Sequence, residues 1–296
     1  MSDQGVLVTI DGDVIEVADP GRPVLYADDL AAVRGDGVFE TLLVRAGGAC
    51  LVDAHLRRLA ESAALTDLPE PHIPTWRRAI AAAVGGWADN SDDEAVLRLV
   101  YSRGRESGSP PTAFLTVGPV AARVGAARRD GVSALLLDRG LAAAGAESMP
   151  WLLAGAKTLS YAVNMAALRH AARTGADDVI FVSSDGLILE GPRSTVVIAA
   201  PDSTGRPGFL TPPPWHPILR GTTQQALFEV AAQKGYTCEY RPLQPADLAA
   251  AQGVWLVSSI TLAARVHTLD GRALPPNPMA AEVAELVDAA IVGDRE

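Results

Sequence analysis

The order in which strand-like and helix-like segments follow one another is the feature that most restricts the fold of this 296-residue chain. Two β-branched runs, 6–10 and 14–17, flank Asp11-Gly12, which predicts a β-hairpin at the start of the chain. Further strands and helices then mix without the strict strand-helix-strand order of a parallel doubly wound sheet. The sequence therefore predicts an α+β fold built from layered sheets and helices.

A segment rich in Ala, Gly and Arg divides these elements into two groups. Residues 119–130 show no clear hydrophobic period, so we expect an interdomain linker there. The predicted organisation is an N-terminal α+β domain over 1–118, that linker, and a C-terminal domain over 131–296. We expect helices over 53–63, 75–87, about 160–174 and 222–234, a short one near Ala246, and one at the C-terminal end.

Composition and charge exclude several classes of partner. Hydrophobic residues make up 48% of the chain and charged residues 20%, as in globular proteins. The net charge is −10 and no run of basic residues occurs, so nucleic acid and anionic membranes are poor partners. The chain has neither an export signal nor an apolar run of about 18 residues, and we expect a cytoplasmic protein.

Several common catalytic signatures are missing. The five histidines occur singly, and Cys50 and Cys238 lie far apart, so we expect buried reduced thiols and no metal site. The sequence contains no phosphate-binding loop of the Gly-x-x-x-x-Gly-Lys type, no His-Glu-x-x-His and no Gly-x-Ser-x-Gly. Metal-dependent and serine-dependent hydrolysis therefore lack their usual motifs.

One lysine stands out because the chain contains only two. Lys234 precedes a glycine at the end of a predicted helix, where a cation is ordinary. Lys157 instead lies in the small and apolar stretch Gly155-Ala156-Lys157-Thr158-Leu159-Ser160-Tyr161. Arginine never deprotonates, so a chain that uses arginine for 23 of its 25 basic residues but places a lysine here favours a chemical role for this amine.

Lysine chemistry on an amino substrate requires an electrophilic cofactor, and pyridoxal phosphate provides one. That cofactor needs a carboxylate for its pyridine nitrogen, for which Glu190 is a candidate, although alone it would be an ordinary surface residue. Its phosphate needs N–H and hydroxyl donors. Gly221-Thr222-Thr223 at a helix N-terminus supplies such donors, or simply caps the helix. Ser258-Ser259 either adds hydroxyls or ends a strand.

Taken together, these stretches resemble the fold-type IV pyridoxal phosphate enzymes, which comprise branched-chain aminotransferases, D-amino acid aminotransferases and 4-amino-4-deoxychorismate lyases. The resemblance is collinear, covers most of the chain, and rests on the following stretches: 34–41 (RGDGVFET), 55–59 (HLRRL), Lys157 with Asn164, 175–178 (GADD), 190–194 (EGPRS), 219–223 (LRGTT) and 258–259 (SS).

The resemblance implies a role for each matching residue. Lys157 would bond covalently to the cofactor and carry the proton, and Glu190 would pair with the pyridine nitrogen. The implied cofactor-binding residues also include Arg58, Ser194, Gly221, Thr222, Thr223, Ser258 and Ser259. The implied substrate-binding residues are Phe39, Arg98, Arg103 and Tyr161. The family further implies a small N-terminal domain, a barrel-like C-terminal domain, the cofactor between them, and a homodimer.

Three functions remain open at this stage. The sequence favours a 4-amino-4-deoxychorismate lyase, because 157–161 and 102–104 resemble that branch and Val96 replaces an aromatic of branched-chain aminotransferases. Arg103 and Arg105 also suit a substrate with two carboxylates. The alternative is an aminotransferase for branched-chain or D-amino acids, acting on a small amino substrate. A non-catalytic binding protein is disfavoured because the chain has the family's residues at the lysine, glutamate and phosphate-binding positions. The chain departs from the family at Thr195, where many members have Asn, and this change alters only local hydrogen bonding.

Overall fold

The computed structural model describes residues 5–201, 205 and 207–292, and these residues divide into two compact units. The first unit contains the chain up to Ala121 together with Ala156–Tyr161. The second contains Ala122–Gly155 and Ala162–Gly293. No helix in the described ranges is both long enough and apolar enough to cross a membrane.

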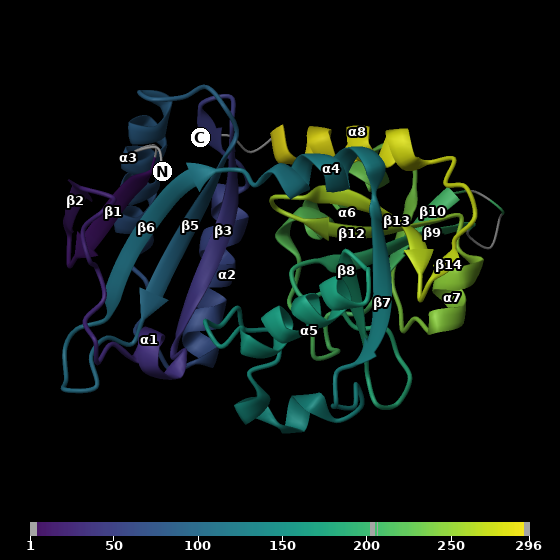
Figure 1. The fold of residues 1–296 in the computed structure, drawn as a ribbon, viewed down its shortest axis with the longest axis horizontal. Helices are drawn as coiled ribbons and strands as arrows, with labels where there is room; N and C mark the ends of the chain where they lie inside the picture. Colours follow the sequence, from purple (N-terminus) through teal and green to yellow (C-terminus); the bar gives the residue numbers. More distant parts are fainter. Residues whose placement is uncertain (1–4, 202–204, 206, 293–296) are drawn as a thin grey trace. The chain divides into compact units, whose positions relative to one another are not determined.

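The first unit is an antiparallel sheet with helices packed on one face (Figure 1). The order of its strands is β2-β1-β6-β5-β3-β4. The strands are β1 (Val6–Asp11), β2 (Val14–Ala18), β3 (Gly37–Arg45), β4 (Gly48–Ala49), β5 (Ala95–Ser102) and β6 (Thr112–Pro119), and the helices are α1 (Leu30–Arg34), α2 (Val52–Leu65) and α3 (Ile73–Ala88). The expected first hairpin and the expected helices over 53–63 and 75–87 are confirmed.

The core of this unit lies between the sheet and helices α2 and α3. Alternate residues of β3, among them Val38 and Leu42, point into it together with Leu56 and Leu59 of α2. Because side chains alternate across a strand, the intervening Phe39 and Thr41 lie on the opposite face of the sheet. One face of β3 therefore stabilises the unit, and the other is available for function.

The second unit contains a mixed sheet that curls around its own core (Figure 1). The strand order is β11-β10-β9-β12-β13-β7-β8, with β14 paired to β13. The strands are β7 (Val132–Asp138), β8 (Asp178–Val182), β9 (Thr195–Pro201), β10 (Pro207–Thr211), β11 (Thr237–Tyr240), β12 (Gly253–Ser258), β13 (Leu262–Leu269) and β14 (Arg272–Ala273). Side chains from six of these strands converge on one apolar cluster, which is the barrel-like arrangement expected from the sequence.

Helices surround this sheet. They are α4 (Ala122–Asp130), α5 (Ala162–Arg173), α6 (Thr222–Gln233), α7 (Pro245–Ala250) and α8 (Ala280–Val292), with short 3-10 turns at Ala146–Ser148 and Pro150–Leu152. The expected helices near 222–234, Ala246 and the C-terminal end are confirmed. Helix α5 begins at Ala162, two residues later than expected, because Thr158 and Leu159 bond to β3 instead.

One stretch differs from its sequence-based expectation. Residues 122–130, which fall within the linker expected over 119–130, form helix α4 and belong to the second unit. The helix has almost no apolar face, since Val124 is its only buried residue, which explains why its period is invisible in the sequence. It is held by packing on β13 and by the Arg128 guanidinium, which donates to the carbonyl of Ile260.

Candidate functional site

The backbone around Lys157 is fixed to the edge of strand β3. Phe39 N–H donates to the carbonyl of Lys157 (3.0 Å), and Leu159 N–H donates to the carbonyl of Gly37 (2.8 Å). The N–H of Lys157 donates to the hydroxyl of Ser62 on α2 (3.1 Å). Strand β4 has only two residues and pairs with the far end of β3, which leaves this edge open for the lysine segment.

Two aromatic rings surround the Lys157 amine. Its Nζ lies 4.4 Å from the ring centroid of Phe39 and 5.5 Å from that of Tyr161. The two rings meet edge to face, with centroids 5.3 Å apart. A ring face attracts a cation, so this arrangement holds the amine in place. Three of the predicted site residues are thereby brought together.

Arg98 lies on the same face of the sheet as Phe39. It is opposite Thr41 across the β3–β5 pair, and facing residues of an antiparallel pair share one side of a sheet. Its side chain is exposed, in contrast to those of Leu97 and Leu99 on either side. The structure thus puts Arg98 on the face that carries Phe39, where a cation can meet an anionic substrate.

Behind this face, a buried charge network joins β3 to α2. Glu40 accepts bonds from Nε and Nη2 of Arg58, each at 2.7 Å, and lies 2.7 Å from Nδ1 of His55. All three side chains are buried. Burial alone would raise the pKa of Glu40, but Arg58 and His55 hold this pKa well below its usual value. Glu40 is therefore ionised, and His55 Nδ1 must carry a proton.

The network makes stability depend on pH. Burial lowers the pKa of His55 by more than its bond to Glu40 raises it. Unfolded His55 therefore takes up a proton below about pH 6.5, whereas the folded side chain does so only at lower pH. The free energy of unfolding falls with falling pH in between, by up to about 1.4 kcal/mol per pH unit. Urea unfolding between pH 5 and 8 measures this slope.

His55→Gln is expected to reduce that slope. The control is His72→Gln, because His72 is exposed, and it should keep the wild-type slope. Equal slopes in the wild type and His55→Gln would contradict the assignment of the pH dependence to His55.

The two loop arginines are held by bonds within the first unit. Arg103 donates through Nε to Asp36 (2.7 Å) and through its terminal nitrogens to the carbonyls of Thr66 and Asp67. Arg105 donates to Asp28 (2.8 Å). The role of Arg103 toward a substrate carboxylate stays a prediction, and these bonds weigh against it.

In the second unit, Glu190 is fixed at the end of the segment that pairs with β8. Its carbonyl accepts from the N–H of Phe181 (2.9 Å), and its Oε2 accepts from the N–H of Leu219 (3.0 Å). The amide of Asn164 on α5 donates to the carbonyl of Pro192 (2.7 Å), which secures the loop that follows. The carboxylate is partly buried and oriented by these bonds.

Three hydroxyls converge at the N-terminus of α6. The Ser259 hydroxyl lies 3.5 Å from that of Thr222 and 3.4 Å from that of Thr223. A side chain at Gly221 would collide with Thr195 Oγ1, so glycine is required at this helix entry. Hydroxyls and N–H groups at a helix N-terminus form a ready site for phosphate.

The other two predicted serines lie elsewhere in this unit. Ser258 accepts the N–H of Thr261 (3.3 Å), and both Ser194 and Ser258 line a separate cavity. Ser194 Oγ is buried and makes no hydrogen bond to a described residue. Their roles in cofactor binding stay predictions, and their placement favours Ser259 as the serine of the hydroxyl group at α6.

Sequence reasoning assigned no role to Glu40, His55 or Ser62. The sequence does contain one signal for a buried charge, because Glu40 is a charged residue at the inward-facing strand position between the apolar residues Val38 and Leu42. The spacing of His55 and Arg58 also puts them on one face of a helix. Over the described residues, no group of three or more potential metal ligands occurs.

The antiparallel sheet of the first unit and the curled mixed sheet of the second, with a buttressed lysine and a hydroxyl-lined helix N-terminus, define a fold-type IV enzyme. Residues 37–269 match the model of the aminotransferase class IV family. The chain belongs to this family.

Known relatives agree over nearly the whole length. The chain is 68% identical over 292 residues to a bifunctional aminodeoxychorismate lyase / D-amino acid transaminase of Mycobacterium tuberculosis, covering 98% of this chain and 100% of the relative. Structures of a hypothetical aminotransferase from Mycobacterium tuberculosis, in a PLP-bound form and in an alpha-ketoglutarate- and PMP-bound form, show 68% identity and a TM-score of 0.93 over the same shares. A fold IV-transaminase from Curtobacterium pusillum shows 40% identity and a TM-score of 0.90, covering 98% of this chain and 100% of that chain.

Proposed function

We propose that this protein is a pyridoxal phosphate-dependent 4-amino-4-deoxychorismate lyase that releases pyruvate and 4-aminobenzoate for folate synthesis. The observation that carries this proposal is the 68% identity, over all of the relative, to a protein named for that lyase activity. The same name includes D-amino acid transaminase, which supports transamination of D-amino acids as the second candidate activity.

The residues present suit the proposed cofactor. The hydroxyls of Thr222, Thr223 and Ser259 are donors for a phosphate, and the carboxylate of Glu190 is an acceptor for a protonated pyridine nitrogen. When bound, pyridoxal phosphate supplies an electron sink for the electrons left by a departing proton. In the first unit, Arg58 is a further candidate for the phosphate, since Glu40 fixes its guanidinium.

Lys157 then has the role of moving the proton. Its Nζ is held by the rings of Phe39 and Tyr161, and it takes the proton from the aminated carbon of the substrate. In the lyase reaction, loss of this proton and of the side chain on the neighbouring carbon makes the substrate ring aromatic and releases pyruvate. In transamination, the amino group stays behind and a keto acid leaves. Arg98 would contact a substrate carboxylate on the same face.

Glu190→Gln is expected to retain the cofactor but to slow proton removal by roughly 10²-fold or more, because an amide does not keep the pyridine nitrogen protonated. Single-turnover kinetics with substrate deuterated at the aminated carbon measure this step. Cofactor content measured on the same sample separates slow chemistry from lost binding, and an unchanged rate would rule out the proposed role.

The activity itself is tested with two sets of substrates. Purified protein is incubated with 4-amino-4-deoxychorismate and, separately, with L- and D-amino acids plus 2-oxoglutarate. Equal amounts of 4-aminobenzoate and pyruvate would establish the lyase. Glutamate formed from D-amino acids alone, without 4-aminobenzoate, would replace the lyase by the transaminase and make Arg98 a contact for a single carboxylate.

The proposed homodimer finds support in several exposed apolar side chains of the second unit. Trp151, Leu152 and Leu153 are exposed, as are Val163 and Met165 of α5. Large apolar side chains of this kind commonly mark interfaces. Light scattering of the wild type should give twice the monomer mass, and Trp151→Ser should shift the equilibrium toward monomer; a monomeric wild type would exclude the dimer.

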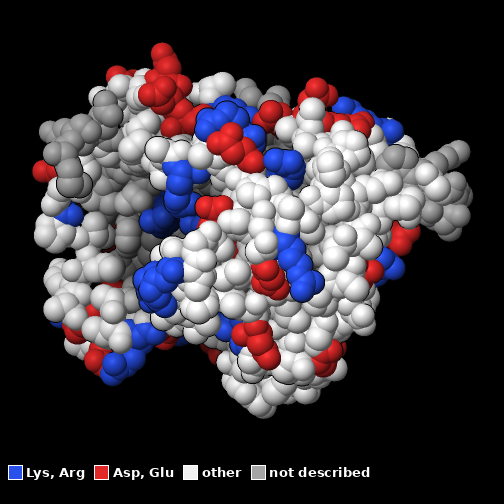
Figure 2. All heavy atoms as spheres, turned by 45° about the vertical axis from the view of Figure 1, so that its right-hand side comes forward, with Lys and Arg blue, Asp and Glu red and all other residues white. Residues whose placement is uncertain are grey.

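The proposed setting is the cytoplasm, with a small amino compound as substrate and no nucleic acid partner. Cys50 and Cys238 are free thiols, as suits a reducing compartment. On the face drawn in Figure 2, basic and acidic side chains are interspersed, in line with the net charge of −10.

A further inference from the structure

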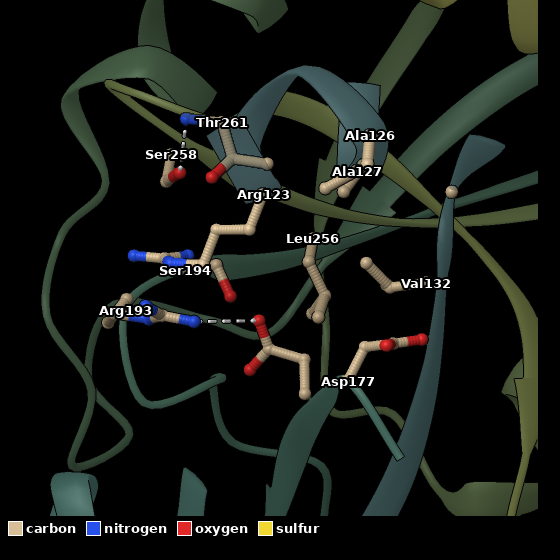
Figure 3. A pocket seen from close by; sticks show the side chains of 13 residues that line it. Arg123, Ala126, Ala127, Val132, Asp177, Arg193, Ser194, Leu256, Ser258 and Thr261 are labelled. Carbon is tan, nitrogen blue, oxygen red and sulfur yellow. Dashed lines mark hydrogen bonds and ion pairs between the residues drawn. The ribbon is translucent and has the colours of Figure 1, made fainter. Parts of the chain in front are cut away.

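The second unit contains a cavity of about 220 Å³ next to helix α4 (Figure 3). Arg123, Ala126 and Ala127 of α4 form one wall. The other walls come from the ends of β7, β8, β12 and β13 and from the loop before β9. This volume is several times that of one water molecule in the liquid, so a small ion or molecule fits into the cavity.

The cavity presents more hydrogen-bond donors than acceptors. Arg123 reaches from α4 toward Arg193, and within the described residues it makes no hydrogen bond or ion pair (Figure 3). Arg193 pairs with Asp178 at 3.6 Å. The oxygen of Ser258 accepts the N–H of Thr261, so the Ser258 proton is free to donate, and the hydroxyl of Thr261 has no hydrogen-bond partner in the described part of the chain.

The carboxylates of the cavity do not balance these donors. Asp177 accepts from the N–H and the hydroxyl of Ser133 (2.8 and 2.7 Å), and Figure 3 shows it pointing away from the arginines. Asp178 is mostly buried, and this burial raises its pKa despite the neighbouring Arg193. A single carboxylate therefore faces two guanidinium groups. Desolvation and the charge of Arg193 lower the pKa of Arg123, although the charge of Asp178 acts in the opposite direction.

We propose that this cavity binds a small oxyanion, in the form of a carboxylate or a phosphate. Arg123 and Arg193 are its charged donors, and the hydroxyls of Ser258 and Thr261 are its neutral donors. Guanidinium groups bind both carboxylate and phosphate through paired N–H bonds, which makes an oxyanion the suitable occupant.

The remaining lining fits the same ligand. Val132, Leu256 and Ala264 form an apolar floor, which has room for a short aliphatic chain attached to a carboxylate. Ser258 is followed directly by Ser259, whose hydroxyl lies next to Thr222 and Thr223. An anion held by Ser258 and Thr261 would therefore also steady the turn that presents Ser259.

The test is calorimetric titration of the protein saturated with pyridoxal phosphate, so that the hydroxyl group at α6 is already occupied. Inorganic phosphate is the titrant in one arm and propionate in the other, at constant ionic strength; the tighter arm identifies the source of the oxyanion. We expect saturable binding of one ion per chain. Arg123→Gln should weaken it at least about tenfold, since a hydrogen bond to a charged group contributes this much.

Arg129→Gln is the matched control, because Arg129 lies on the same helix, is exposed and pairs with Asp130. It should bind as the wild type does. Thr261→Val, which keeps the side-chain shape, should also weaken binding. It serves as the test if Arg123→Gln does not fold. The proposal is overturned if neither ion binds saturably, if Arg129→Gln weakens binding as much as Arg123→Gln, or if binding disappears in Thr223→Val but survives in Arg123→Gln.

Discussion

Lys157→Ala is expected to lose all measurable turnover, a fall of at least about 10⁴-fold, together with the covalent bond to pyridoxal phosphate. The physical reason is that no second amine is available in its place. The amine of Lys157 is held over Phe39, and the only other lysine, Lys234, is the exposed C-cap of α6. Steady-state assays measure the turnover. Borohydride treatment followed by peptide mass spectrometry shows whether the cofactor is attached.

Lys234→Ala is the control for this experiment. It removes the second amine without touching the rings or hydroxyls of the candidate site, so both turnover and the reducible link should match the wild type. Retained turnover in Lys157→Ala, or loss of the link in Lys234→Ala, would refute the assignment of Lys157 as the reacting lysine.

Glu40→Ala is expected to destabilise the protein by roughly 3–5 kcal/mol, because it leaves Arg58 buried without its carboxylate. Glu40 is fully buried and accepts two bonds from Arg58 and one from His55. Denaturant unfolding at neutral pH measures the change in the free energy of unfolding.

The control is Glu16→Ala, which breaks the exposed pair of Glu16 and Arg22 and should cost less than about 1 kcal/mol. Equal losses in the two variants would contradict the structural importance of the buried network. Cofactor binding gives a second measurement. If Glu40 also orients the guanidinium of Arg58 for binding the phosphate, Glu40→Gln should weaken binding of pyridoxal phosphate. It should weaken binding of pyridoxal, which has no phosphate, less.

Much of the fold could be predicted from the sequence because its signals are local. The Asp11-Gly12 turn between β-branched runs determined the first hairpin, and hydrophobic periods located α2, α3 and α6. Helix α4 was missed for the same reason. It buries only Val124, and the contacts that hold it, with β13 and Ile260, come from residues far away in the chain.

The candidate site likewise has features that the sequence predicted and features that it could not predict. The sequence by itself determined which amine and which motif residues matter, because the scarcity of lysine and the order of the motifs are properties of the chain alone. It could not show that Glu40, His55 and Arg58 form one buried network, because a strand and a helix must first pack together.

Only the tertiary structure decided which of two adjacent serines lies at the N-terminus of α6 and which lines the cavity. Ser258 and Ser259 are neighbours in the sequence, yet Ser259 meets Thr222 and Thr223, whereas Ser258 lines the cavity with Arg123 and Arg193. Successive side chains at the end of a strand point to opposite faces, and what lies on each face is set by elements that are distant in the chain. The sequence determined the groups that can react, and packing determined which of them meet.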